Sequence, residues 1–215
     1  MAVELDLMLA GEPMRALGDR ALYWPARRRL LIADLHLGKG DIFRRAGIAL
    51  PSGGTHHDLA RLAALVEHTG AHELWVLGDV LHGPAPQASW RGHVDRWRRQ
   101  HHHLRVIALA GNHDRDLDAA ADLGFEVFPD SVEDGPFVLR HHPQPDPQRH
   151  VLCGHLHPVF KAPGTTVRWP AFLLRQEMTV LPAFSQFTAG VVPDLAPGER
   201  LIACVEGQAI ALPPA

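Results

Sequence analysis

Residues that commonly bind metal ions gather in five short stretches of the sequence. Each stretch contains aspartate, asparagine or histidine, and together they extend over more than half of the chain. Neutral imidazole and carboxylate groups are frequent ligands of divalent metal ions in proteins. If the fold brings these stretches together, they form one metal site. The stretches are Asp34-Leu35-His36, Gly78-Asp79, Gly111-Asn112-His113-Asp114, His141-His142 and Gly154-His155-Leu156-His157.

The five stretches supply enough ligands for two metal ions. Asp34 and His36 are two residues apart, so on an extended segment both side chains point to the same side and can bind one ion. The same argument applies to His155 and His157. The carboxylate of Asp79 can bridge two cations, which would also share a water. The expected metal ligands are Asp34, His36, Asp79, Asn112, His141, His155 and His157.

A pair of divalent ions in such a site suits the hydrolysis of a phosphate ester. Two ions about 3.5 to 4 Å apart can hold phosphate oxygens, activate water near neutral pH and stabilise an in-line displacement. Four imidazole ligands disfavour magnesium, so we expect manganese, with iron or zinc as alternatives. Asp79 and His113 are the expected catalytic residues. His113 follows a ligand but points elsewhere, so it could protonate the leaving alkoxide as a general acid.

The five stretches directly follow apolar runs that the pattern predicts to be strands. The carboxyl ends of strands are where open α/β sheets bind ligands. Helical patterns alternate with strands in the first two thirds of the chain, and the rest is rich in strands. A four-layer αββα sandwich of two mixed β-sheets flanked by helices fits both parts. The strands that lead into the stretches are expected at 29–33, 73–77, 104–110, 137–140 and 150–153.

Other patterns complete the expected fold. The strand at 21–24 forms a hairpin with the strand at 29–33. A helix at 55–68 has apolar residues at helical spacing, with Thr55 as its cap and Gly70 as its end. The chain of 215 residues, 46% of them hydrophobic, can bury the core of one domain over 1–215. Further strands are expected at 166–174, 179–184 and 201–205, and further helices at 87–100 and 116–123.

The composition limits the possible partners. A formal net charge of -3 gives no overall attraction to polyanions, so contact with nucleic acid would depend on a local patch. The basic stretch 91–105 is expected to be the solvated face of an amphipathic helix. No apolar run is long enough to span a bilayer, so we expect no membrane contact and a cytoplasmic protein. Cys153 and Cys204 are expected to be buried as small apolar residues.

The order of the motifs resembles that of a known superfamily. Asp-x-His, Gly-Asp, Gly-Asn-His-Asp, His-His and Gly-His-x-His look like the motifs of the calcineurin-like metallophosphoesterases, from about 34 to 157. Four segments are similar to the bacterial DNA-ligase-associated metallophosphoesterases, which are described as DNA damage response endonucleases. These segments are Asp34-Leu35-His36-Leu37-Gly38-Lys39, Phe43-Arg44-Arg45-Ala46-Gly47, Gly154-His155-Leu156-His157-Pro158 and Leu181-Pro182-Ala183-Phe184.

The resemblance implies an αββα sandwich and an assignment of the ligands. His142 is an alternative to His141, although the ligand of the superfamily usually follows the strand directly. Phosphatases of the superfamily often have an acid three residues after the bridging aspartate, and it orients the catalytic histidine. That position is His82 here, so Asp114 is a second candidate to orient His113. The implied ligands are Asp34, His36 and His157 for the first ion, Asn112, His141 and His155 for the second, and Asp79 as the bridge.

The sequence thus favours a metal-dependent phosphodiesterase that acts on nucleic acid or nucleotides. The resemblance adds a link to DNA repair and an association with a DNA ligase or helicase. Lys39 and Arg44 are expected to contact substrate phosphate, although each could equally be a solvated surface residue. A small-molecule phosphatase or cyclic-nucleotide phosphodiesterase is an alternative, since the net charge is acidic and the chain is short. A non-catalytic scaffold of a repair complex is disfavoured because all seven ligands are present.

Overall fold

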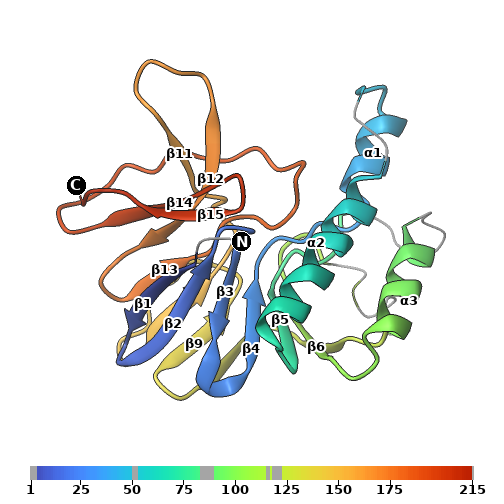
Figure 1. The fold of residues 1–215 in the computed structure, drawn as a ribbon, viewed down its shortest axis with the longest axis horizontal. Helices are drawn as coiled ribbons and strands as arrows, with labels where there is room; N and C mark the ends of the chain where they lie inside the picture. The colour runs from blue at the N-terminus through green and yellow to red at the C-terminus, as the bar shows by residue number, and fades with distance from the viewer. Residues whose placement is uncertain (1–3, 50–52, 83–89, 115–116, 118–122, 215) are drawn as a thin grey trace.

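Two β-sheets form the centre of the protein (Figure 1), in a computed structural model that describes residues 4–49, 53–82, 90–114, 117 and 123–214. The first sheet has the strand order β1-β2-β3-β4-β5-β6-β7. Its first four strands pair antiparallel, and β4, β5, β6 and β7 pair parallel. The strands are β1 (Leu5–Leu9), β2 (Glu12–Leu17), β3 (Ala21–Trp24), β4 (Arg29–Ile32), β5 (Glu73–Leu77), β6 (Arg105–Leu109) and β7 (Glu126–Phe128).

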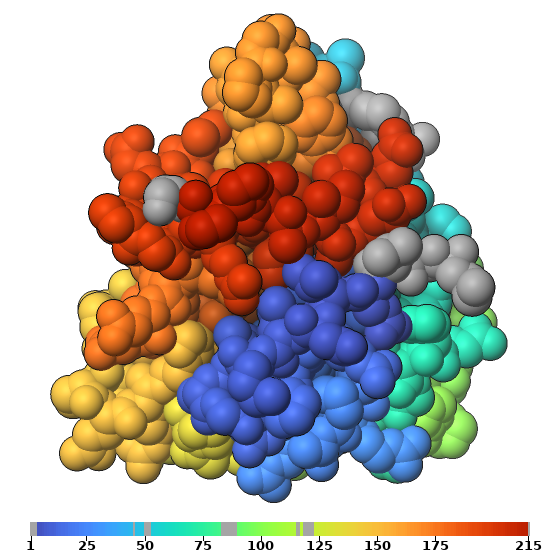
Figure 2. Space-filling model, turned by 60° about the vertical axis from the view of Figure 1, so that its left-hand side comes forward, coloured from blue at the N-terminus to red at the C-terminus, as the bar shows by residue number. Residues whose placement is uncertain are grey.

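The second sheet has the order β15-β14-β12-β13-β10-β9-β8, and β11 pairs with β12. β9, β10 and β13 are parallel, and the other pairs are antiparallel. In Figure 2, the first strands in blue lie against the last strands in red, where Gly18 and Gly207 form a bridge. The strands are β8 (Ser131–Asp134), β9 (Phe137–Arg140), β10 (His150–Cys153), β11 (Val159–Lys161), β12 (Arg168–Leu174), β13 (Met178–Val180), β14 (Arg200–Val205) and β15 (Gln208–Ala211).

Alternation along β4 creates two apolar layers. Leu30 and Ile32 belong to a cluster shared with helices α2 (Gly54–Thr69) and α3 (Arg91–Gln100). Leu31 and Ala33 belong to a second cluster that fills the space between the sheets. Successive side chains of a strand point to opposite faces, so β4 is apolar throughout because both of its faces are covered.

The structure confirms the expected class, an α/β sandwich of two mixed sheets. The described helices that pack on a sheet, α2 and α3, lie on the outer face of the first sheet. In the described part of the chain, the outer face of the second sheet is covered without a helix, by side chains of loops and of the short strand β11. These are Leu156, Phe160, Leu195 and Leu212, which pack on Val151, Cys153, Ala171 and Leu173.

Most of the expected elements are present. The strands at 21–24 and 29–32 form the predicted hairpin, and Gly70 ends α2 in a left-handed conformation with its N–H bonded to Val66 O. α3 begins at Arg91, and Val94 and Trp97 are its buried residues, as the amphipathic pattern predicts. Cys153 and Cys204 are unpaired and buried. None of the described helices is long and apolar enough to cross a membrane.

Several expectations need correction. Thr55 does not cap α2, because the helix begins at Gly54 and its cap position is Gly53. The strand expected at 179–184 ends at Val180, since Phe184 instead bonds to Ala33 of the other sheet. The helix expected at 116–123 lies almost wholly outside the described residues. The strands β1, β2, β7, β8, β11 and β15 and the short helix α1 (Lys39–Arg45) were not predicted.

Candidate metal centre

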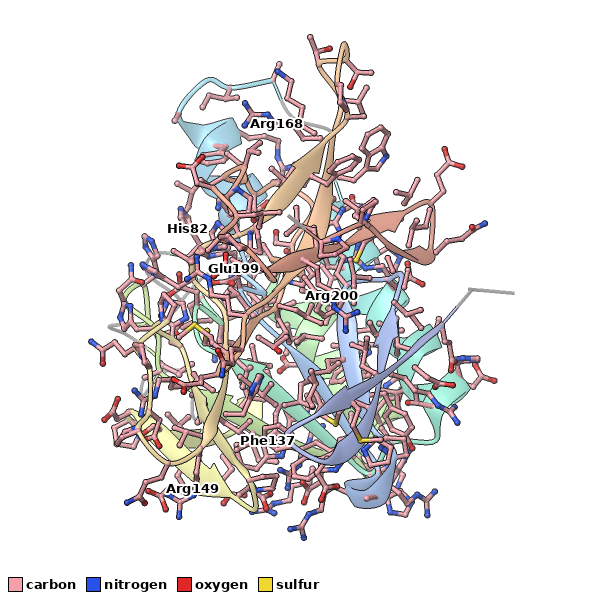
Figure 3. All side chains as sticks on the ribbon, turned by 90° about the vertical axis from the view of Figure 1, so that its left-hand side faces the viewer. His82, Phe137, Arg149, Arg168, Glu199 and Arg200 are labelled. Carbon is pink, nitrogen blue, oxygen red and sulfur yellow. The ribbon has the colours of Figure 1, made fainter. Side chains whose placement is uncertain are left out.

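The five motif stretches meet at the carboxyl ends of the strands. They follow β4, β5, β6, β9 and β10, all of which have a parallel neighbour, so their ends lie at the same edge of the two sheets. In Figure 3, Phe137 and Arg149, at the starts of β9 and β10, lie low in the view. His82, which follows the end of β5, lies well above them. The fold therefore brings together residues that are more than a hundred positions apart.

Asp34, His36 and His157 form one group of possible ligands. Their ligand atoms lie within 4.8 Å of one another, and Asp34 Oδ1 is 3.1 Å from His157 Nε2. Asp34 and His36 are buried. Both ring nitrogens of His36 and Nε2 of His157 are buried without a hydrogen-bond partner. Buried polar atoms usually have partners, so these nitrogens fit a cation placed between them.

His141, Asn112 and His155 form a second group. His141 Nε2 lies 2.9 Å from Asn112 Oδ1 and 3.1 Å from His155 Nδ1. His141 Nδ1 lies 3.1 Å from the carbonyl oxygen of Leu77, which can only accept a hydrogen bond. In the neutral ring Nδ1 therefore donates, and Nε2 presents its lone pair to the other two groups. Three ligand atoms that converge in this way also fit a cation.

Asp79 lies between the two groups. Its Oδ1 is 3.6 Å from His141 Nε2, and its Oδ2 is 3.9 Å from His36 Nε2. One carboxylate oxygen thus faces each group, which is the geometry that a bridging ligand needs. Oδ1 also accepts a hydrogen bond of 3.0 Å from the backbone N–H of His113.

His142 has a different position from His141. Its side chain is exposed, and its ring centroid lies 4.5 Å from that of His155. One of its ring nitrogens lies within 4.8 Å of the ligand atoms of His141 and His155. His142 therefore remains close enough to act as an additional ligand, while His141 alone has its second nitrogen fixed by a backbone carbonyl.

The backbone of the ligands is unusual. Nine non-glycine residues of the described part have a positive φ, and five of them are predicted metal ligands. This conformation costs about 1 to 3 kcal/mol per residue and concentrates at functional sites. The extended segments assumed for Asp-x-His and Gly-His-x-His are therefore wrong, although the side chains do converge. The five residues are Asp34 (φ 54°), His36 (φ 47°), Asp79 (φ 48°), His155 (φ 71°) and His157 (φ 49°).

Burial favours the neutral form of two of the predicted imidazole ligands, His36 and His155. It lowers the pKa of His36 to about 2, with a further contribution from the nearby charge of Lys39. Burial, His141 and His142 lower the pKa of His155. A neutral imidazole is the form that binds a metal ion, so these histidines need not lose a proton when a cation binds near neutral pH.

His113 lies at the rim of the site. Its side chain is 47% exposed, and Nε2 is 4.0 Å from Asp79 Oδ2. The ring of His82 packs beside it, with centroids 5.1 Å apart. Asp114 accepts hydrogen bonds from the backbone N–H groups of Val80, Leu81 and Gly111, which ties the loop after β5 to the loop after β6. Among the described contacts, neither His82 nor Asp114 hydrogen-bonds to the His113 ring.

The two predicted substrate contacts separate in the structure. Lys39 begins α1 and lies close enough to Asp34 and Asp79 for their charges to raise its pKa, although burial lowers it overall. Arg44 pairs with Asp41 and lines a cavity of about 120 Å³ between α1, α2 and Trp90. Only Lys39 therefore shares its surroundings with the metal ligands.

Sequence reasoning missed a group of buried charges behind the site. Asp58 and Arg61 of α2 lie on the buried side of the helix, and Arg61 donates to the carbonyl oxygen of Phe184. A signal was present, because both fall at helical spacing with the apolar Leu62 and Leu65. Charged residues within an apolar stripe require partners, and the sequence does not show where those partners are.

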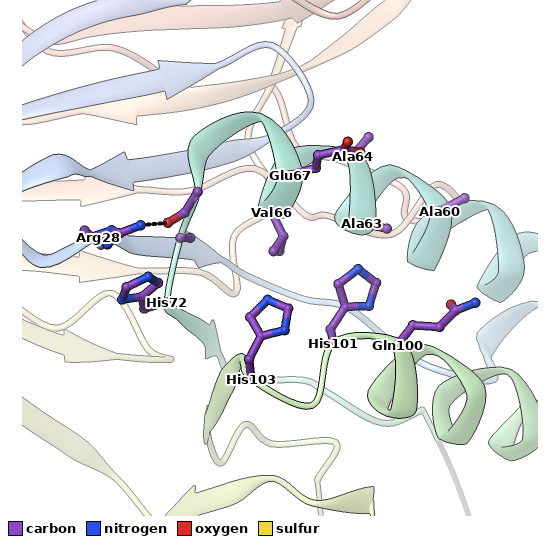
Figure 4. A pocket seen from close by; sticks show the side chains of 12 residues that line it. Arg28, Ala60, Ala63, Ala64, Val66, Glu67, His72, Gln100, His101 and His103 are labelled. Carbon is purple, nitrogen blue, oxygen red and sulfur yellow. Dashed lines mark hydrogen bonds between the residues drawn. The ribbon is translucent and has the colours of Figure 1, made fainter.

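A separate cavity of about 740 Å³ lies away from the ligands, between α2, α3 and the loop at Gly70 (Figure 4). Ala60, Ala63 and Val66 line one side, and His101 and His103 line the other. The groups of possible metal ligands found among the described residues do not include these histidines. This cavity is therefore not part of the metal centre.

Among solved structures, the chain is similar to the Pseudomonas putida nuclease MPE. The two share 37% sequence identity with a TM-score of 0.85, over 97% of this chain and 100% of that one. YfcE, a phosphoesterase from E. coli, is a more distant match with 20% identity and a TM-score of 0.48, over 85% of this chain and 96% of that one. No family model and no curated protein matches the sequence.

The fold and the aspartate and histidine groups are consistent with a metallophosphoesterase fold. The chain belongs to the family of the Pseudomonas putida nuclease MPE, because the identity and the structural likeness extend over nearly all of both chains. Membership of the DNA-ligase-associated subfamily remains a prediction.

Proposed function

We propose that the protein is a hydrolase that uses two divalent metal ions to cleave phosphodiester bonds in nucleic acid. The observation that carries this proposal is the convergence of two ligand groups on the two oxygens of Asp79. The name of the similar Pseudomonas putida protein, a nuclease, supports nucleic acid as the substrate. Manganese is the expected metal, with iron or zinc as alternatives, because imidazole nitrogens are prominent among the ligands.

The residues of this chain have distinct proposed roles. The bound ions would neutralise phosphate charge, activate water and stabilise the displacement. His113 is exposed at the rim and held to Asp79 by its backbone, so its ring can donate a proton to the leaving oxygen. His82 packs against that ring and limits its orientation. The ligand sets are Asp34, His36 and His157, and Asn112, His141 and His155, with Asp79 shared.

Two cationic side chains extend the site towards substrate. Lys39 lies near the carboxylates of Asp34 and Asp79, where it would attract a phosphate bound to the ions. Arg44 is on the same short helix but lines a different cavity, so it would contact a phosphate further along a nucleic-acid strand. This arrangement favours a polymer over a small phosphomonoester.

The biological setting is part of the proposal. The resemblance to DNA-ligase-associated proteins supports a role in DNA repair, with a DNA ligase or helicase as a partner. Two buried cysteines without a disulfide fit the reducing environment of the cytoplasm.

The test is a comparison of substrates with one preparation of the protein. We expect manganese-dependent cleavage of single-stranded DNA, duplex DNA or RNA, which a chelator abolishes and manganese restores. His113→Ala should lower the rate about a hundredfold or more, since a general acid contributes at least this much. Asp79→Ala should abolish it. His103→Ala, in the separate cavity, is the control and should retain wild-type activity.

Two results would contradict the proposal. Full activity of Asp79→Ala or His113→Ala would show that hydrolysis does not use this site. Cleavage of phosphomonoesters or cyclic nucleotides without any cleavage of nucleic acid would favour the small-molecule alternative.

A further inference from the structure

The segment 184–191 contacts the backbone of two predicted metal ligands. The N–H of Phe184 donates to Ala33 O at 2.8 Å, and the N–H of Ser185 donates to Asp34 O at 3.2 Å. Further along, the N–H of Val191 donates to His157 O at 3.1 Å. Asp34 and His157 both have a positive φ, so this segment supports two strained positions of the site.

Charged side chains hold this segment from behind. Arg61 of α2 donates to Phe184 O and, at 3.2 Å, to Asp58, and its guanidinium lies 4.1 Å from the centre of the Phe184 ring. Arg20, in the turn between β2 and β3, donates to Ser185 O at 3.0 Å. Asp58 accepts a hydrogen bond from the backbone of Gln186. Polar backbone groups of three successive residues are therefore held by charged side chains that are buried or half-buried.

Asp58 and Arg61 are largely removed from water, which disfavours their charged forms. The side chains of Arg61 and Asp58 are only 11% and 5% exposed. Burial raises the pKa of Asp58 to about 6 and lowers the pKa of Arg61 to about 10. A buried ion pair contributes little net stability compared with apolar residues of the same volume. Stability alone is thus a poor reason for these residues at this place.

The same segment also fixes the start of both nearby helices. A Cβ placed on Gly54 would lie 2.1 Å from the ring of Phe187, and one placed on Gly40 would lie 3.4 Å from it. The ring therefore sits directly on the first turns of α1 and α2. Because α1 begins at Lys39, the segment that supports Asp34 also packs against the helix that carries this cationic side chain.

We propose that Arg61 is a positioning residue for the metal centre. Together with Asp58 and Arg20 it fixes the segment 184–191, which in turn holds the backbone of Asp34 in the conformation that directs its carboxylate at the ions. This inference deepens the proposed function and rests on it. Arg61 touches neither the ions nor the substrate, so its loss should change metal affinity before anything else.

Arg29 provides a matched control for Arg61, because it lies at the end of β4 that is far from Asp34. Arg29 begins β4, whereas Asp34 follows its end. The side chain of Arg29 is 7% exposed, pairs with Glu73 at 2.8 Å and lies 4.3 Å from the centre of the Trp75 ring. Arg29 and Arg61 are thus both largely withdrawn from solvent, ion-paired and stacked on an aromatic ring. Loss of either should lower stability, but only Arg61 is connected to Asp34.

The experiment measures the dissociation constant of Mn²⁺ by calorimetry and the melting temperature without metal. It uses the whole chain as wild type, Arg61→Gln, Arg61→Lys and Arg29→Gln. We expect Arg61→Gln to weaken Mn²⁺ binding about tenfold or more, the usual effect of losing an outer partner of a ligand. Arg61→Lys should recover part of the affinity. Arg29→Gln should lower the melting temperature and leave the affinity unchanged.

The results separate this inference from the proposed function. If the wild type does not bind Mn²⁺, the proposed function itself fails. If the wild type binds and Arg61→Gln binds equally well at a lower melting temperature, Arg61 is only structural and the inference is overturned. If Arg61→Gln does not fold, Asp58→Asn provides the same comparison with a smaller change. Wild-type affinity in Asp58→Asn would then overturn the inference.

Discussion

The two ends of the parallel strands β4, β5 and β6 differ in how their polar groups are satisfied. At the amino ends, Arg29 pairs with Glu73 at 2.8 Å and also with Asp134. Arg105 pairs with Glu126 at 2.7 Å and with Glu73 at 3.2 Å. Each of these charges has a partner of opposite sign within the protein.

The carboxyl ends show the opposite arrangement. Both nitrogens of His36 and Nε2 of His157 are buried and make no hydrogen bond, although carboxylates lie close to them. The backbone is left-handed at Asp34 and Asp79, which follow β4 and β5. A buried unsatisfied polar group costs about 1 to 3 kcal/mol, and each strained residue costs a similar amount. At the amino ends the charges are paired within the protein, whereas at the carboxyl ends buried ring nitrogens and strained residues converge where a bound cation would fit.

A pair of substitutions at the two ends of β4 tests this difference with the largest expected effects. In the absence of metal, His36→Leu should raise the free energy of unfolding by about 1 kcal/mol or more, because it removes two unsatisfied nitrogens. Arg29→Leu should lower it by about 3 kcal/mol, because it removes the charge-assisted hydrogen bonds that the buried guanidinium donates to Glu73 and Asp134. Urea denaturation of metal-free protein gives both values.

The affinity for Mn²⁺ is a second measurement that separates His36→Leu from Arg29→Leu. His36→Leu should weaken Mn²⁺ binding more than about a hundredfold, beyond the effect of losing an outer partner. Arg29→Leu should bind Mn²⁺ as the wild type does. If metal-free His36→Leu were less stable than the wild type, the carboxyl end would not be a destabilised region and the comparison would fail.

The convergence of the candidate metal ligands could be predicted from sequence because its signals are local. Each motif follows an apolar run, and the carboxyl ends of such runs meet at one edge when the strands are parallel, as they are here. The backbone conformation could not be predicted in the same way. Periodicity indicates alternation in a strand, whereas Asp34 and His36 lie just beyond β4 in left-handed turns. The convergence was predicted for the wrong geometric reason.

The support behind the site could not be predicted because its contacts are distant in sequence. Arg61 meets Phe184, which is 123 positions away, and Arg20 meets Ser185, which is 165 positions away. The short helix α1 was missed for a related reason. Seven residues do not form a stable helix by themselves, so α1 depends on packing against other segments such as the ring of Phe187.

The pH dependence of stability should also differ between the two ends of the strands, because each end has an acid with a shifted pKa. Burial acts to raise the pKa of Glu73, at the amino end, but hydrogen bonds from Trp75 and Arg29 lower it below its usual 4.5. Burial raises the pKa of Asp58, behind the carboxyl end, from 3.8 to about 6. A lowered pKa stabilises the fold above it, and this stability is lost as pH falls. The raised pKa of Asp58 has the opposite effect. The folded state holds its proton more tightly than the unfolded state, so this contribution to stability is lost as pH rises from about 4 to about 6.

The two neutral variants should therefore show opposite pH dependence. Relative to the wild type, Asp58→Asn should gain stability as pH rises from about 4 to about 6, by an amount of order 3 kcal/mol. Glu73→Gln should lose stability at pH 7 and approach the wild type as pH falls below 4.5 and the Glu73 carboxylate of the wild type is protonated. Denaturation at a series of pH values measures both. The same slope in the two variants would show that the two acids do not experience different environments.

The smallest change in the free energy of unfolding is expected from Arg105→Ala. The side chain of Arg105 is 52% exposed, so water and salt already screen its ion pairs with Glu126 and Glu73. Its loss should lower the free energy of unfolding by less than about 1 kcal/mol. The difference should vanish at about 1 M salt, where the screening length is about 3 Å. Mn²⁺ binding should not change, because Arg105 lies at the far end of β6 from Asn112. A weaker affinity for Mn²⁺ in this variant would show that the amino ends also position the ligands, and the division between a stabilising end and a functional end would no longer hold.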